Sequence, residues 1–117
     1  MSIRIELRED TLILALPQEF SLGQAHVVLD PVARLLAAGR VTALAIDMTD
    51  TRFVNAEGLS VLRTLTDLAE ARGAPATAVV PNVHLRRLLR VLDLDQGMNL
   101  TEHWPADSSA APRLGTE

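Results

Sequence analysis

A nearly continuous apolar run leads directly into a helix start near the middle of the chain. Residues Val41 to Met48 have the length of a strand, and their composition is typical of a strand buried on both faces. After a short loop, Asn55 is a favourable N-cap residue, and the apolar spacing over residues 56–72 predicts a helix that ends at Gly73. A buried strand followed by such a helix predicts an α/β fold with parallel strands.

The flanking sequence continues the alternation of strands and helices. The first residues alternate between apolar and charged side chains, which predicts a strand with one solvated face. Glu9-Asp10 fits a two-residue turn into a second, antiparallel strand, which Pro17 ends because proline cannot donate to the ladder. The predicted elements, in residue numbers, are strands over 3–7, 12–16, 41–48, 76–80 and 98–102 and helices over 21–38, 56–72 and 82–92.

Pro31 conflicts with the first predicted helix. Ser21 and Gln24 fit a capping box at its start, and Gly39 fits its end. An interior proline removes a hydrogen bond and kinks a helix. Alternatively, Asp30 caps a shorter helix with Pro31 at its first position. We expect a kinked or interrupted helix.

Length and composition bound the remaining choices. The 117 residues correspond to one domain, which we expect over residues 1–104, whereas residues 105–117 lack periodicity and predict a disordered tail. The net charge of -4 argues against general nucleic-acid binding. Cysteine is absent, which excludes disulfides and thiol catalysis. No apolar run approaches the roughly 20 residues of a membrane helix, and the charged first residues are unlike a signal peptide, so we expect a cytoplasmic protein.

The loop and helix start after the central strand resemble the signature of STAS domains, the family of anti-sigma-factor antagonists. In that family the segment reads Phe-x-Asp-Ser-Ser/Ala-Gly-Leu, and the serine after the aspartate is the phosphate acceptor. Phe53, Gly58 and Leu59 match the signature. Asn55 stands in the place of the aspartate, and Ala56 stands in the place of the phosphoacceptor serine.

The resemblance extends over about residues 3–103 and implies a fold. It is a single α/β domain of the STAS type, with a mixed sheet of four to five strands and about three helices. The N-terminal hairpin is antiparallel and the remaining strands are parallel, which agrees with the order of elements predicted from the periodicity.

The resemblance also implies a function. It indicates a bacterial regulator of transcription that binds an anti-sigma factor or a related serine-kinase-like regulator, and that is neither an enzyme nor dependent on a cofactor or metal. A second copy of the chain is a further candidate partner. The alternative function is an accessory subunit of a lipid-transport ABC system or of a larger signalling assembly. The expected partner-binding residues are Asn55, Ala56, Glu57, Gly58 and Ser60.

Three residues of this helix start carry the functional interpretation. Ala56 has no hydroxyl group, so the phosphorylation of the family cannot occur there. Gly58 costs about 1 kcal/mol inside a helix, which capping does not explain and which favours close approach of an outside surface. Glu57 either imitates a phosphate or points away from the binding surface. We favour the second interpretation, because adjacent helical residues differ in direction by about 100°.

Hydroxyl and carboxylate side chains nearby have two interpretations each. Ser60, Thr49 and Thr51 are candidates for a displaced phosphoacceptor, although a turn or capping role is favoured for each. Asp47 and Asp50 lie at the carboxyl end of a buried strand, where α/β folds place ligands. No glycine-rich phosphate loop accompanies them, so solvation of the loop is favoured over acid–base or Mg²⁺ chemistry.

The other polar candidates are scattered along the chain. The three histidines lack the spacing of metal ligands. Three arginines of the last predicted helix form a basic edge, for which a solvated face is favoured over contact with an acidic partner. Trp104 is expected to hold the last strand through its large buried area. These histidines and arginines are His26, His84, His103, Arg86, Arg87 and Arg90.

Overall fold

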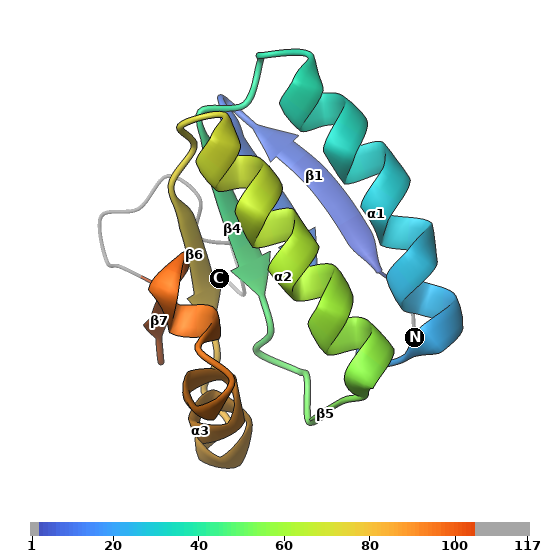
Figure 1. Ribbon diagram of the computed structural model, residues 1–117, viewed down its shortest axis with the longest axis vertical. Coiled ribbons are helices and arrows are strands. Elements are labelled where there is room, and N and C mark those ends of the chain that lie inside the picture. Colours follow the sequence, from blue (N-terminus) through green and yellow to red (C-terminus); the bar gives the residue numbers. More distant parts are fainter. Residues whose placement is uncertain (1–2, 105–117) are drawn as a thin grey trace, which may run out of the picture.

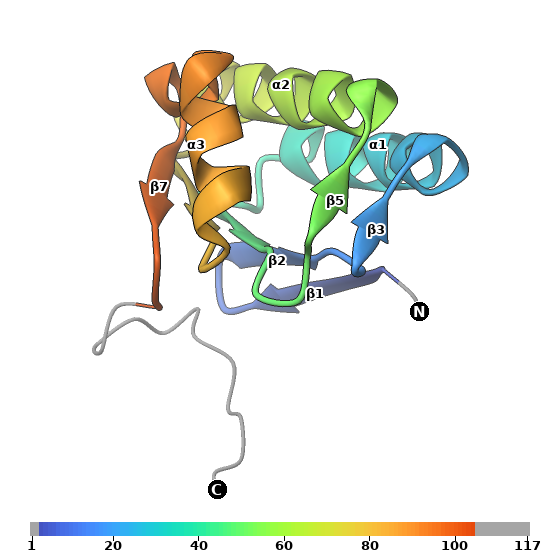
Figure 2. The same cartoon turned by 90° about the horizontal axis from the view of Figure 1, so that it is seen from below.

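The computed structural model describes residues 3–104, in which a five-stranded sheet carries its two long helices on one face (Figure 1). Figure 2 shows the helices as a layer above the sheet. The elements are β1 (Arg4–Arg8), β2 (Thr11–Ala15), β3 (Glu19–Phe20), α1 (Leu22–Ala37), β4 (Ala43–Asp47), β5 (Phe53–Val54), α2 (Ala56–Ala71), β6 (Ala76–Val79), α3 (Val83–Val91), the 3₁₀ turn η1 (Leu94–Gln96) and β7 (Asn99–Thr101).

The strand order in the main sheet is β1-β2-β4-β6-β7. β1 and β2 form the antiparallel hairpin, and β2–β4, β4–β6 and β6–β7 are parallel pairs. The predicted α/β architecture, a mixed sheet with three helices, is therefore confirmed. The short last strand is also present. The predicted tail, residues 105–117, lies outside the described residues.

The core lies between the sheet and the helices. Alternate residues of β2 and β4, such as Leu14 and Ile46, face the helices and are fully buried. The register aligns Leu14 with Ile46 and Ile46 with Ala78, so one apolar row crosses three strands. Ile13 and Ala45 point to the opposite face, where Trp104 packs against them. Trp104 thus holds the chain after β7 against the sheet.

The helix α1 runs without interruption through Pro31. The predicted interruption and the alternative start at Pro31 are both wrong, the kink stays a prediction, and the capping box of Ser21 and Gln24 is present. Proline has a φ angle that a helix accepts, so its cost is a missing hydrogen bond and local crowding. Four apolar residues of α1 are buried against the sheet, and this burial outweighs the local penalty. They are Ala25, Val28, Val32 and Leu36.

A small second sheet was not predicted from the sequence. β3 and β5 pair in parallel, with Glu19 beside Phe53 and Phe20 beside Val54. Two-residue strands have too few positions to show a period of two, and each lies in a segment expected to be a loop. Because β3 leads into α1 and β5 leads into α2, their pairing sets the starts of these two helices beside each other (Figure 2).

Candidate functional site

The start of α2 is capped as its sequence predicts. The side-chain oxygen Oδ1 of Asn55 accepts a hydrogen bond from the backbone N–H of Gly58 at 2.9 Å. The backbone oxygen of Asn55 accepts from the N–H of Leu59, also at 2.9 Å. These two bonds fix the first turn of α2. Ala56 and Glu57 are exposed in that turn, so this end of α2 is accessible from outside.

Gly58 is buried, and the chain itself occupies the space beside it. A Cβ atom at this position would lie 2.7 Å from the carbonyl oxygen of Phe20 and 2.7 Å from Cγ1 of Val54. The sequence-based interpretation, in which an outside surface approaches Gly58, is replaced by an internal one. Gly58 is needed because α2 begins in direct contact with the β3–β5 pair.

Glu57 extends toward the neighbouring helix α1. Its Oε1 atom lies 3.5 Å from Nε2 of His26, and both side chains are more than half exposed. An ion pair between exposed groups stabilises a protein by at most about 1 kcal/mol. The contact therefore matters for the direction of the side chain, because it shows that the carboxylate of Glu57 lies along the surface toward α1.

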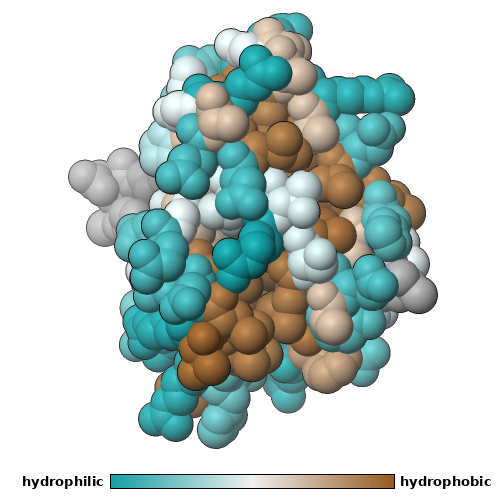
Figure 3. All heavy atoms as spheres, in the orientation of Figure 1, coloured by the Kyte–Doolittle hydropathy of each residue, from teal (hydrophilic) through white to brown (hydrophobic). Residues whose placement is uncertain are grey.

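The exposed residues around this helix start form a mixed surface. Phe53 is 54% exposed, because β5 alternates and its buried residue is Val54. Ser60 is exposed one turn after Ala56 and lies on nearly the same side of α2. Figure 3 shows hydrophobic residues gathered in the lower part of this face, over α3 and the start of α2. Phe53 of β5, just before α2, and Leu88 of α3 are among the large apolar residues that remain exposed.

The structure separates the three candidate displaced phosphoacceptors. Thr51 is 1% exposed and its hydroxyl lies 3.5 Å from the carbonyl oxygen of Leu16, so a kinase cannot reach it in the folded protein. Thr49 is exposed, but its hydroxyl donates to Oδ1 of Asp47 at 2.7 Å. Ser60 is exposed on α2 and is the most accessible of the three.

The carboxylate of Asp47, at the end of β4, accepts hydrogen bonds from the turn that follows the strand. Oδ1 of Asp47 accepts from the backbone N–H of Thr49 at 3.0 Å as well as from its hydroxyl. Asp50 is exposed. Within residues 3–104 no group of histidine, aspartate and glutamate side chains is arranged to hold a metal ion. The arrangement therefore favours a structural role for Asp47.

The basic edge predicted on α3 requires a correction. Arg86 is only 8% exposed. Its Nη1 donates to the carbonyl oxygen of Val80 at 2.7 Å, and its Nη2 donates to Oε2 of Glu102 at 3.1 Å. Arg86 therefore joins α3 to the ends of β6 and β7. Arg87 and Arg90 are exposed and remain available to solvent or a partner.

The three histidines lie in different parts of the described fold. His26 is beside Glu57, and Nε2 of His103 is 3.8 Å from Oε1 of Glu102. His84 is exposed near the start of α3.

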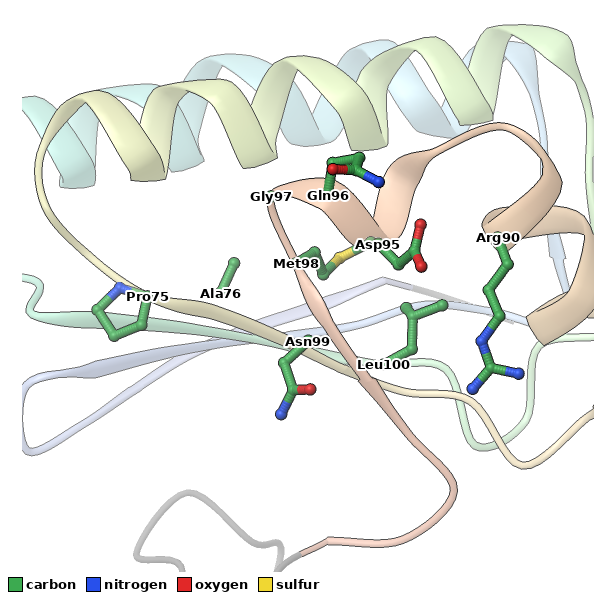
Figure 4. A pocket seen from close by; sticks show the side chains of 9 residues that line it. All are labelled: Pro75, Ala76, Arg90, Asp95, Gln96, Gly97, Met98, Asn99 and Leu100. Atoms are coloured by element: carbon green, nitrogen blue, oxygen red, sulfur yellow. The ribbon is translucent and has the colours of Figure 1, made fainter.

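A cavity of about 500 Å³ lies at the β7 side of the sheet, between β6, η1 and β7 (Figure 4). Arg90 and Asp95 both line it and carry opposite charges, so it offers no net positive charge to a phosphate group. The remaining lining is neutral. It consists of Pro75, Ala76, Gln96, Gly97, Met98, Asn99 and Leu100.

The family model of the STAS domain matches residues 2–105. The chain belongs to the STAS-domain family. The matched range includes every described strand and helix, together with the Asn55–Gly58 turn. No curated protein matches this sequence.

Solved structures of anti-sigma factor antagonists share the fold of this STAS domain. Unphosphorylated SpoIIAA of Bacillus is 13% identical, with a TM-score of 0.75 over 88% of this chain and 90% of that chain. TM1081 of Thermotoga maritima is 19% identical, with a TM-score of 0.74 over 86% of each chain.

A segment of a transporter is also similar in fold. The murine anion transporter Slc26a9 is 14% identical, with a TM-score of 0.62 over 87% of this chain and 17% of that chain.

No helix of this STAS domain, within the residues described, has the length and apolar character needed to cross a membrane.

Proposed function

We propose that the protein is a regulator of the anti-sigma-factor-antagonist type, which binds an anti-sigma factor or a related serine-kinase-like protein through the start of α2. Asn55, Ala56, Glu57 and Ser60 supply the contact surface, and Gly58 holds this turn against β3 and β5. The observation that carries the proposal is an exposed, well-capped helix start at the signature position of a STAS fold. We expect it to act in the bacterial cytoplasm and to catalyse no reaction.

The proposal includes a fixed regulatory state. Ala56 is exposed and cannot carry a phosphate, and the carboxylate of Glu57 is directed toward His26 of α1. A partner approaching α2 along its axis would therefore meet an uncharged first residue. This supports a surface that resembles the unphosphorylated state, in which the protein is always competent to bind.

Affinity capture from the native cell, followed by mass spectrometry, tests the proposal. The wild-type chain and Ala56→Asp serve as paired baits, because a charge at the proposed contact should remove the specific partner. A serine-kinase-like protein captured by the wild type alone is the expected result. Equal capture by both baits would contradict the proposed surface.

A second candidate function is an accessory role beside a transporter. The observation in its favour is the likeness in fold between this chain and a segment of the Slc26a9 transporter chain. Capture from detergent-solubilised membranes separates the two candidates. A transporter subunit retained through washing, with no kinase-like protein in the soluble fraction, would favour the accessory role.

We expect Glu57→Ser to leave partner affinity unchanged, or to lower it by about 0.5–2 kcal/mol if Glu57 contacts a cation of the partner. These values span the range between an exposed and a partly buried ion pair. The reason is that the carboxylate of Glu57 is directed toward His26 of α1. Titration calorimetry measures the effect, with Glu70→Ser at the other end of α2 as the control for lost charge. A tenfold gain in affinity, about 1.4 kcal/mol, would instead make Glu57 a permanent phosphate mimic.

We expect no phosphorylation between Asn55 and Leu59, which contain no hydroxyl side chain. Incubation with the cognate kinase and ATP, followed by peptide mapping, measures this. Ala56→Ser restores the hydroxyl and is the positive control. Stoichiometric phosphate on Ser60 of the wild-type chain would show that the switch has moved by one turn of α2.

A further inference from the structure

The outer edge of β1 has no neighbouring strand within the described part of the chain. β1 pairs with β2 on one side only, over Arg4–Arg8. Its other side therefore presents unpaired backbone N–H and C=O groups, which can pair with a further strand. No proline and no glycine interrupts this strand.

Apolar surface accompanies this edge. Ile5 and Leu7 face the same side of the sheet as their partners Leu14 and Leu12, which are fully buried. Ile5 is nevertheless 38% exposed and Leu7 is 42% exposed. The core of a single chain therefore leaves the apolar side of β1 partly uncovered.

The helix α1, which lies beside β1 in Figure 1 and above it in Figure 2, extends this apolar surface. Val27, Pro31 and Leu35 are four residues apart, so they form a line along α1. Val27 is 69% exposed, and the other two are partly exposed. His26 marks the side of α1 next to α2, and Leu35 lies about 180° around the helix from it. The line therefore faces away from α2, toward the β1 side.

The charged side of β1 is complementary to itself in one antiparallel register. Arg4 and Glu6 both point to the side opposite Ile5. Suppose that two antiparallel copies of β1 pair about Ile5, so that the two Ile5 residues lie directly opposite each other. Arg4 of each copy then lies opposite Glu6 of the other copy. Arg4 is exposed and has no ion-pair partner among residues 3–104, whereas Glu6 already lies 2.6 Å from Nη2 of Arg8.

No other register combines opposite charges with apolar pairs along the whole strand. Pairing about Glu6 sets Glu6 against Glu6 and Arg4 against Arg8, and like charges directly opposite are destabilising. Pairing about Leu7 also sets Glu6 opposite Arg8, but it sets Ile5 against the charged Glu9, which lies beyond the end of β1 with a φ of 56°. A shift by one residue would exchange the apolar and charged sides of one strand.

We propose that two copies of the protein form a homodimer in which their β1 strands pair antiparallel about Ile5. The arrangement is a closed, two-fold interface that joins both sheets into one and brings the Val27 line of each α1 to the same interface. The start of α2 lies on the other side of α1 and stays accessible. The dimer is thus independent of the partner proposed above.

Charge reversal at β1 tests the register. In sedimentation experiments we expect the wild type to dimerise, and Arg4→Glu and Glu6→Arg each to raise the dimer Kd about tenfold or more, because two opposite-charge contacts become two like-charge contacts. Arg72→Glu and Glu70→Arg are matched controls on exposed positions of the α2 end, and should leave the Kd unchanged. Circular dichroism checks that each variant is folded.

Mixing the two variants gives the sharper result. Arg4→Glu and Glu6→Arg are each expected to repel themselves but to complement each other, so an equimolar mixture should form a heterodimer detectable by native mass spectrometry. A wild-type chain that stays monomeric at millimolar concentration would overturn the proposal. So would a dimer that neither reversal weakens, or folded variants that do not associate when mixed.

Discussion

Replacing Gly58 by alanine is expected to lower the free energy of unfolding by about 1–3 kcal/mol, the usual cost of overpacking. The added Cβ would lie 2.7 Å from the carbonyl oxygen of Phe20 and 2.7 Å from Cγ1 of Val54. The first of these atoms belongs to the backbone of β3, so the contact is relieved only if β3 and α2 separate. The strain exceeds the roughly 1 kcal/mol that alanine gains over glycine in helix propensity. Chemical denaturation of the two proteins measures the difference.

Gly23 supplies the matched control for this substitution. It also lies in the first turn of a helix, but a Cβ there would meet no atom within 4 Å. Gly23→Ala should therefore be neutral or stabilising, by about 0.4–1 kcal/mol. Equal stability changes at Gly58 and Gly23 would show that the close contact between α2 and the β3–β5 pair is absent in solution.

Introducing a charge at Ala56 is expected to weaken partner binding by about 1–3 kcal/mol, which is roughly fivefold to more than a hundredfold in Kd. Ala56 is the exposed first residue of α2, and an aspartate there would carry its charge into the proposed contact. The fold should tolerate Ala56→Asp, because a carboxylate is favourable in the first turn of a helix. Titration calorimetry with the captured partner measures the affinity.

Ala56→Asn separates charge from size in this experiment. Asparagine has nearly the shape of aspartate without its charge, so a smaller loss of affinity is expected. Equal losses for the two variants would indicate that size excludes the partner. If Ala56→Asp binds as tightly as the wild type, the interface lies elsewhere on the domain and the proposed role of the α2 start is wrong.

Features that depend on neighbouring residues along the chain were predictable from the sequence. The buried strand β4, the cap of α2 at Asn55 and the capping box of Ser21 with Gln24 all follow from local composition and spacing. Hydrogen bonds of caps form within three or four residues, and burial on one or both faces leaves a period in the sequence. The alternation of these elements, together with the Phe53–Leu59 signature, was sufficient to predict the STAS fold.

Features that depend on contacts between distant segments were decided only by the tertiary structure. Gly58 is required because Phe20 meets it, Arg86 is buried because Glu102 and the end of β6 receive its hydrogen bonds, and Thr51 is inaccessible because it is packed beside Leu16. None of these pairs leaves a local pattern. Whether a glycine, an arginine or a threonine faces solvent or the interior is set by which remote groups the fold brings beside it, and a periodicity within one helix or strand contains no information about those groups.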